Sequence, residues 1–339
     1  MTGLMVLVGA GASYDCSSRP NPSSAWQPPL VKDLFAERFA PVIDRHPYVQ
    51  TISAKVRRQA VEGAEPLEEF IRLRLLESLS ARDRMQFWSL PWYLKDLLVT
   101  CSRGYTEHAD HYDLLADEVL KVSDAMLVSL NYDTLLDREL SKDRRLETLD
   151  SYLGSDWSLV KLHGSINWRR RAAGASPPEL VSRLATGSAQ ILDEFSHEAQ
   201  QPEPHWDADI PAIAVPAGPE DRFSCPPAHV EHLRQWLRAR RSFSLLVVGY
   251  RCFDRGVLRL ISESEANITR LLVANGKGAG GVVPAREAVK ALQAELGPRA
   301  PDPRLRDHDE IEEFDGGFAE LIATRRHAAF FEASLDPDA

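Results

Sequence analysis

The first residues of the chain place the strongest limit on its fold. An apolar run, Leu4 to Val8, ends in the glycine-rich sequence Gly9, Ala10, Gly11, Ala12, Ser13. This pattern predicts a buried parallel strand that enters a tight turn before a helix. Glycine lets the backbone approach a ligand closely, and N–H groups at such a turn point toward an anion. The turn is therefore a candidate phosphate site, although an ordinary turn without a ligand fits the same residues.

Length and composition indicate a globular protein. The 339 residues are 44% hydrophobic, which suits one large domain or two ordinary ones. No apolar run approaches the roughly 18 residues of a membrane span, and the apolar start lacks the basic flank of a signal peptide. We therefore expect a cytoplasmic protein without a membrane partner. The net charge of −10 argues against direct binding of nucleic acid.

The spacing of cysteine and histidine favours no metal centre. The four cysteines are scattered without a CxxC pair, so neither a disulfide framework nor a four-cysteine zinc site is indicated. Candidate ligands lie near one another at His108, His111 and Asp113, and at Cys225, His229 and His232. Neither group supplies a complete ligand set, so we expect no metal.

Further buried apolar runs predict the rest of a sheet. They lie at residues 125–130, 158–162, 243–248 and 270–274, with an expected edge strand at 308–314. Between the first two strands, residues 30–123 read almost entirely as helix, with apolar residues three or four positions apart. The predicted fold class is therefore α/β, with a parallel sheet and an inserted helical subdomain.

The same patterns predict the domain boundaries. Residues 1–29 and 124–325 form the α/β domain, 30–123 the helical subdomain, 172–210 a lid or insertion, and 326–339 a C-terminal tail. The insertion is polar and proline-rich around one expected helix, Pro178 to Phe195, and a short strand is expected at Ile213 to Val215. Three consecutive arginines, residues 169–171, are candidates to meet a ligand phosphate.

Polar residues follow several of the predicted strands. They are Asn131 and Asp133 after the second strand, His163 after the third, and Gly249, Tyr250 and Asn275 after the later ones. Ligands of open parallel sheets bind at the carboxyl ends of the strands, so these side chains are expected to share a crevice with the glycine turn. Each also has a plainer interpretation, since Asn131 and Asp133 suit a helix cap and His163 a turn.

In this order the motifs GAGAS, NYD, LHGS, VVGY and VAN resemble those of the sirtuin-like superfamily. The resemblance implies a Rossmann-like NAD-binding domain with NAD as the substrate. It implies a pyrophosphate turn at Gly9, Ala10, Gly11, Ala12 and Ser13 with Asp15 beside it, a nicotinamide pocket at Asn131 and Asp133, a general base at His163, and adenosine contacts at Gly249, Tyr250 and Asn275.

The sequence differs from the protein deacylases of that superfamily in two places, and these differences indicate which branch it resembles. The paired CxxC zinc module is missing, and PNPSSAWQPP stands where deacylases carry an arginine-containing stretch over NAD. The sequences GAGASYD, NYDTLLD and KLHGSINW are similar to those of bacterial sirtuin-like anti-phage effectors. These effectors hydrolyse NAD and so deplete infected cells of it. The resemblance thus implies an NAD glycohydrolase that yields nicotinamide and ADP-ribose.

The residues suit this chemistry on physical grounds. Cleavage of the nicotinamide–ribose bond passes through an oxocarbenium-like state, so the enzyme must position a water and stabilise positive charge. Asn131 is suited to hold the water or the ribose, Asp133 the ribose hydroxyls or the nicotinamide amide, and His163 to accept a proton. Because nicotinamide leaves from a cationic pyridinium, no general acid is needed.

Other functions remain open at this point. The chain suits an NAD-dependent protein deacylase or ADP-ribosyltransferase, a cyclase, or a non-catalytic subunit that senses NAD or ADP-ribose. A toxic NADase must be restrained, so we expect a homo-oligomer, or a defence partner such as a HerA-type ATPase or an Argonaute relative. The helical subdomain, residues 30–123, is the candidate contact.

Overall fold

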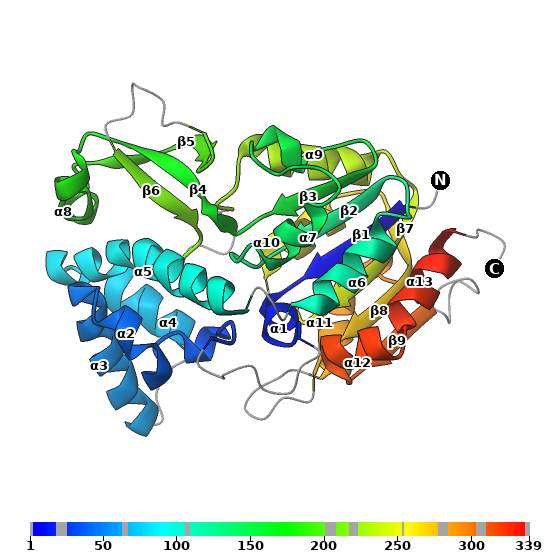
Figure 1. Ribbon diagram of the computed structural model, residues 1–339, viewed down its shortest axis with the longest axis horizontal. Coiled ribbons are helices and arrows are strands. Elements are labelled where there is room, and N and C mark those ends of the chain that lie inside the picture. Colours follow the sequence, from blue (N-terminus) through cyan, green and yellow to red (C-terminus); the bar gives the residue numbers. More distant parts are fainter. Residues whose placement is uncertain are drawn as a thin grey trace.

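The fold is described from a computed structural model of the full chain (Figure 1). The structure describes residues 3–17, 26–62, 67–105, 109–200, 208–216, 223–252, 254–276, 284–302 and 310–335. His108, most of the serine- and proline-rich residues 17–29, for which the sequence predicts a loop, and residues 277–283 lie outside these ranges.

A six-stranded sheet of order β3-β2-β1-β7-β8-β9 forms the centre of the molecule, and all of its neighbouring strands are parallel. The strands are β1 (Gly3–Val8), β2 (Ala125–Ser129), β3 (Trp157–Lys161), β7 (Ser242–Val248), β8 (Asn267–Ala274) and β9 (Glu310–Phe314). This confirms the predicted α/β class, including the edge strand at the end of the chain. The strands β1 and β2 are buried along their whole length, as their unbroken apolar sequences require.

Helices cover both faces of this sheet (Figure 1). In front lie α6 (Asp110–Val119), α12 (Gly317–Ala323) and α13 (Arg326–Leu335), which contact one another, and behind lie α10 (Arg255–Ser262) and α11 (Ala285–Leu296). The two short helices α1 (Ala10–Tyr14) and α7 (Leu135–Leu140) follow β1 and β2. The segment 326–339, which the sequence placed after the domain, thus contributes α13, and this helix packs on β1 and α6.

A helical block fills much of residues 30–105 and has a core of its own. It contains η1 (Val31–Asp33), η2 (Glu37–Phe39), α2 (Ala40–Ile43), α3 (Pro47–Glu62), α4 (Leu67–Ile71), η3 (Arg72–Leu76) and α5 (Ala81–Tyr105). Phe39, Tyr93 and Leu97 are buried at its centre. Helix α6 lies within the predicted 30–123 range, but its buried residues belong to the core of the parallel sheet.

A second sheet, of order β5-β4-β6, is antiparallel and lies beside α5. Its strands are β4 (Gly164–Ala173), β5 (Gln190–His197) and β6 (Ala208–Ile213). The prediction of one helix over Pro178–Phe195 was wrong in its length. Helix α8 (Leu180–Thr186) ends at Gly187, whose φ is +75°. The following residues pair with β4 instead. The short strand expected at Ile213–Val215 begins earlier and ends at Ile213.

The three arginines of β4 are held by acidic residues of the neighbouring strands. Their guanidinium groups pair with Asp209, Asp193 and Glu194, in the order of the chain from residue 169 to 171. Cross-strand pairs of opposite charge stabilise a sheet, which explains this pattern. These ion pairs give the three arginines a role within the sheet, and their contact with a ligand phosphate stays a prediction.

Helix α9 (Pro227–Arg238) carries a buried histidine into the core beside β3. The ring of His229 lies against Tyr152 and Trp168, and its Nε2 donates to the carbonyl of Leu149 at 3.0 Å. Burial lowers the pKa of His229 to about 4. Among the described residues, no group of three or more histidines, cysteines or acids is arranged to hold a metal, and no helix is long and apolar enough to cross a membrane.

The burial of His229 predicts a pH dependence of stability. An unfolded histidine binds a proton near pH 6.5, whereas His229 in the folded protein does so only near pH 4. The unfolded state therefore takes up more protons in this window, and stability falls as the pH falls. Between pH 7 and pH 5 we expect His229 to contribute a loss of about 2 kcal/mol. Urea unfolding of wild type and His229→Gln measures it, and equal pH slopes would contradict it.

Candidate functional site

The carboxyl ends of the central strands lie level with one another. Val8 at the end of β1 is in register with Ser129 of β2 and Val248 of β7, and Ser129 and Val248 are in register with Lys161 and Ala274. The order of strands reverses between β1 and β7, because the chain continues from β1 to β2 on one side and returns to β7 on the other. Doubly wound sheets bind their ligands at the carboxyl ends of the strands at this switch point.

The turns after β1 and β7 are in direct contact at the switch point. The N–H of Gly9 donates to Val248 O and that of Gly11 to Gly249 O, both at 2.9 Å. A Cβ on Gly9 would lie 2.7 Å from Gly249 O, and one on Gly11 would lie 2.9 Å from Gly249 Cα. The sequence suggested these glycines for ligand approach, and the structure shows that they first allow the two turns to touch.

The contact between the turns limits what the glycine turn offers to an anion. The N–H of Ala12 also bonds within the turn, to Gly9 O. Ala12 and Ser13 are buried, whereas Ala10 is exposed at the tip of the turn. A phosphate can therefore reach this turn at Ala10, with Gly11 beside it.

Asn131 joins the end of β2 to the glycine turn. Its Nδ2 donates to Gly9 O and to Ser13 Oγ, each at 2.9 Å, and lies 3.3 Å from the hydroxyl of Tyr112. The residue is only 5% exposed. Within the described part of the chain its Oδ1 has no hydrogen-bond partner. Since an unpaired buried carbonyl is costly, this oxygen suits a ligand hydroxyl or a water.

Asp133 is also buried, and it is tied to the helix that follows. Its Oδ1 accepts from the N–H of Leu135, the first residue of α7, at 3.1 Å. Its backbone carbonyl accepts from the fully buried Lys161, whose ammonium also contacts Asp137 at 2.9 Å. Burial raises the pKa of Asp133, while Lys161 and the hydroxyl of Ser13 act against this rise.

His163 lies between β3 and β4 and is partly exposed. Its Nε2 is 2.6 Å from Oδ2 of Asp254, and the two side chains are 22% and 19% exposed. The ring of Tyr132 lies beside the imidazole, with 6.2 Å between the ring centroids. Burial raises the pKa of Asp254, but the hydrogen bonds that its carboxylate accepts from His163 and from the first turn of α10 outweigh it and hold the pKa below its usual range.

The other predicted ligand residues have internal partners. Nδ2 of Asn275 donates to the carbonyl of Tyr250 at 3.2 Å, which ties the end of β8 to the turn after β7. The hydroxyl of Tyr250 accepts from the N–H of Asp254 at 2.9 Å. Asp15 points away from the crevice, since its Oδ2 accepts from the N–H of Ala319 in the first turn of α12 at 3.0 Å.

The structure thus brings most of the predicted site residues to one edge of the sheet and adds two others. Tyr112 of α6 contacts Ser13 and Asn131, and Asp254 contacts His163. No local pattern in the sequence singles out Tyr112. For Asp254 the only signal was its place at the start of a helix after a strand, which also describes an ordinary cap.

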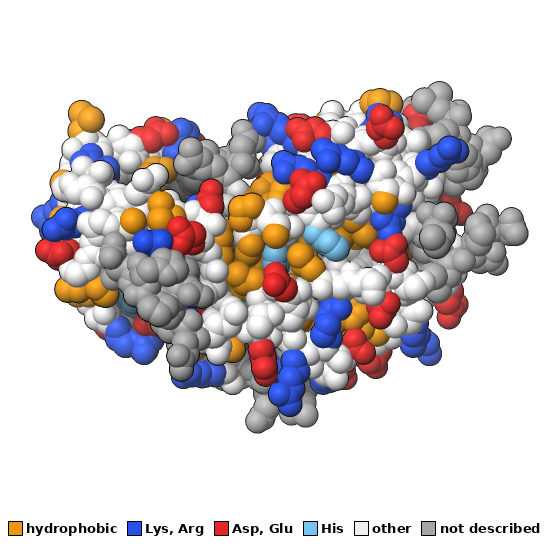
Figure 2. Space-filling view, turned by 90° about the horizontal axis from the view of Figure 1, so that it is seen from above, with side chains coloured by type: hydrophobic (Ala, Val, Ile, Leu, Met, Phe, Trp, Pro, Cys, Tyr) orange, Lys and Arg blue, Asp and Glu red, His pale blue; other side chains and the backbone are white. Residues whose placement is uncertain are grey.

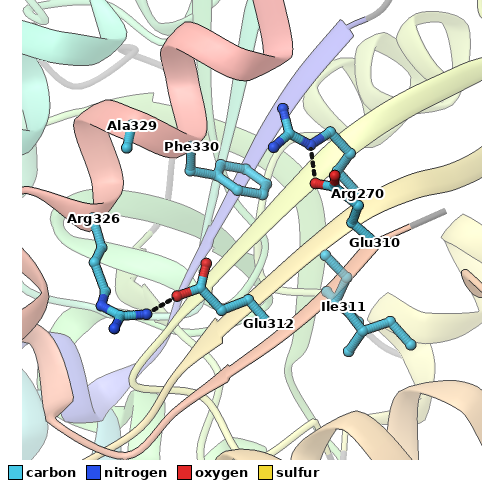
Figure 3. A pocket seen from close by; sticks show the side chains of 8 residues that line it. Arg270, Glu310, Ile311, Glu312, Arg326, Ala329 and Phe330 are labelled. Atoms are coloured by element: carbon cyan, nitrogen blue, oxygen red, sulfur yellow. Dashed lines mark hydrogen bonds and ion pairs between the residues drawn. The ribbon is translucent and has the colours of Figure 1, made fainter. Parts of the chain in front are cut away.

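A cavity of about 590 Å³ lies elsewhere, between α13 and the edge of the sheet. Figure 3 shows Phe330 of α13 extending between two ion pairs, Arg270 with Glu310 and Arg326 with Glu312. These four charged groups neutralise one another in two ion pairs at the cavity.

The face seen from above in Figure 2 has basic and acidic side chains interspersed, without a broad basic area among the described residues.

Comparison with known proteins gave similarities only among solved structures. No protein-family model matches the chain, and no curated protein matches it. A mutant Sir2 homologue in complex with 2′-O-acetyl ADP ribose has a TM-score of 0.42 and 13% identity, covering 99% of this chain and 94% of that chain. A second mutant Sir2 homologue, in complex with ADP ribose, has a TM-score of 0.39 and 12% identity over the same shares.

Proposed function

We propose that this chain is a sirtuin-like NAD glycohydrolase, which binds NAD across the switch point and cleaves it to nicotinamide and ADP-ribose. The observation that carries the proposal is that the glycine turn, Asn131 and the His163–Asp254 pair all lie at the carboxyl edge of a sheet with the dinucleotide-binding strand order. The ordered motifs of the sequence support the same assignment.

The crevice suits the parts of a dinucleotide. The pyrophosphate approaches the β1 turn at Ala10, since that residue is exposed whereas Gly9, Ala12 and Ser13 are buried. The adenosine lies toward β7 and β8, near Gly249 and Asn275, and the nicotinamide ribose lies toward β2 and β3. The unpaired Oδ1 of Asn131 then accepts from a ribose hydroxyl or from the attacking water.

Hydrolysis needs little covalent help from the protein. The bond between ribose C1′ and the pyridinium nitrogen breaks, and its electron pair neutralises the departing nicotinamide. The oxygen of water bonds to C1′, and His163 accepts the proton that this water loses. Asp133 and the Asn131 carbonyl oxygen stabilise the positive charge that develops on the ribose.

The test is incubation of the purified protein with NAD, followed by chromatographic measurement of nicotinamide and ADP-ribose. We expect equal amounts of the two products without any acylated peptide, which separates hydrolysis from deacylation, and no cyclic ADP-ribose. Asn131→Ala removes the unpaired acceptor and a link to the glycine turn, so it is expected to lower kcat/KM by about 100-fold. An unchanged rate in Asn131→Ala would contradict this assignment.

We further propose that this activity serves an anti-phage defence system, and that contacts through the helical block restrain it. The sequence motifs support the first part. The second is supported by two exposed leucines of this block, Leu73 on η3 and Leu79 just before α5, of which Leu79 is 97% exposed. We expect self-association that Leu79→Glu weakens, measured as molar mass by light scattering. A monomer at the same concentration for wild type and variant would contradict this contact, and a mixture with a HerA-type ATPase or an Argonaute relative then tests a partner.

A further inference from the structure

The histidine at the predicted active site is not isolated in the structure. Nε2 of His163 and Oδ2 of Asp254 are 2.6 Å apart, although 91 residues separate them in the chain. The pKa of Asp254 lies below its usual range, so the group that faces the imidazole is a carboxylate. A carboxylate accepts only, so Nε2 must carry the proton of this hydrogen bond.

Asp254 is itself fixed by contacts on its other side. Its Oδ1 accepts from the N–H of Val257 at 3.2 Å and caps α10, while its own N–H donates to the hydroxyl of Tyr250. One carboxylate oxygen is thus taken by the helix and the other is left for the imidazole. A side chain held by its neighbours in this way can hold a functional group in one orientation.

We propose that Asp254 is a positioning residue for His163, which keeps the proton on Nε2 and leaves Nδ1 as the atom that accepts the proton of water. This proposal rests on the NAD cleavage proposed above. Among the described residues, the hydrogen bond of the His163 ring is made through Nε2, and Nδ1 has no partner. Once Nδ1 has taken a proton, the Asp254 carboxylate stabilises the resulting imidazolium, as carboxylates do for histidines in catalytic triads.

The position of Asp254 also connects the base to the ligand crevice. It lies in the same β7–α10 connection as Gly249, whose carbonyl accepts from the glycine turn, and as Tyr250, whose carbonyl accepts from Asn275. The geometry of His163 is therefore set by the turn that closes the switch point. A ligand that shifts this turn would shift the general base with it.

The ring nitrogens of His163 can be observed directly. Protein labelled with ¹⁵N-histidine shows by long-range ¹H–¹⁵N spectra which ring nitrogen carries the proton, and the His163→Gln spectrum assigns the signals. At a pH at which the ring carries one proton, we expect that proton on Nε2 in wild type. In Asp254→Asn, asparagine still caps α10, but its amide can donate to Nε2, so the proton is expected to move to Nδ1. A wild-type ring protonated on Nδ1 would overturn the proposal.

Kinetics then show whether the orientation matters. Asp254→Asn is expected to lower kcat for NAD cleavage by about 100-fold or more with KM changed by less than about threefold, and Asp254→Ser, which also caps the helix, to act alike. Glu287→Gln, an exposed carboxylate of α11 paired with Lys290, is the matched control. Wild-type rates in Asp254→Asn would overturn the proposal. If wild type cleaves no NAD, the proposed function fails, while the ring spectra still decide whether Asp254 positions His163.

Discussion

His163→Ala is expected to lower kcat for NAD cleavage by about 10²- to 10⁴-fold, the usual contribution of a general base. The physical reason is that the attacking water then loses its proton to solvent rather than to a positioned imidazole. The side chain is 22% exposed, so its removal leaves only a shallow cavity and folding should be little affected. Initial rates of nicotinamide release measure kcat, and calorimetry measures the Kd of NAD, which should change by less than about threefold.

The matched control is His232→Ala. His232 also sits in the α/β part of the chain and also has a polar side-chain partner, since its Nε2 lies 2.8 Å from the hydroxyl of Ser158. It lies on α9, away from the carboxyl edge of the sheet, so its removal should leave the rate of NAD cleavage unchanged. Equal losses in both variants would mean that histidine removal acts through folding. A wild-type rate in His163→Ala would remove this residue from the mechanism.

The parallel sheet was predictable because its strands are buried on both faces. Such strands read as unbroken apolar runs, as in β1 and β7, and a run of this kind has no other stable place in the fold. The carboxyl-end rule then predicted one crevice from residues far apart in the chain. The structure brings Asn131 to the glycine turn, although the catalytic roles of Asn131, Asp133 and His163 stay predictions.

The sequence did not predict the second sheet, because ion pairs between residues far apart in the chain help to stabilise it, and local sequence patterns do not reveal such pairs. β5 is polar and partly exposed, and it holds its place through ion pairs with β4 such as Arg170 with Asp193. The pairing of His163 with Asp254 was hidden for the same reason, since only the fold brings the two residues together. Local patterns report burial and periodicity, whereas contacts between distant polar residues follow from the register of the sheet.

Gly249→Ala is expected to cause a large loss of stability, about 4 kcal/mol. Gly249 has a φ of +62°, which an alanine adopts at a cost, and an added Cβ would lie 2.1 Å from the backbone nitrogen of Ala12. Backbone cannot move aside as a flexible side chain can, so the turns after β1 and β7 must separate. The separation breaks the hydrogen bond from Gly11 to Gly249 and opens the crevice in which NAD is proposed to bind.

Gly187→Ala separates the two expected causes of the stability loss in Gly249→Ala, which are the positive φ and the clash of the added Cβ with backbone. Gly187 ends α8 with a φ of +75°, similar to that of Gly249, but an added Cβ would have no atom within 4 Å. This control should therefore lose only the cost of a positive φ, about 1 kcal/mol, and keep its affinity for NAD. Urea unfolding gives the free energies and calorimetry the Kd values. If both variants lose the same free energy, the contact between the turns is not what requires glycine at 249. If Gly249→Ala is unstable but binds NAD normally, the ligand does not depend on the closed switch point.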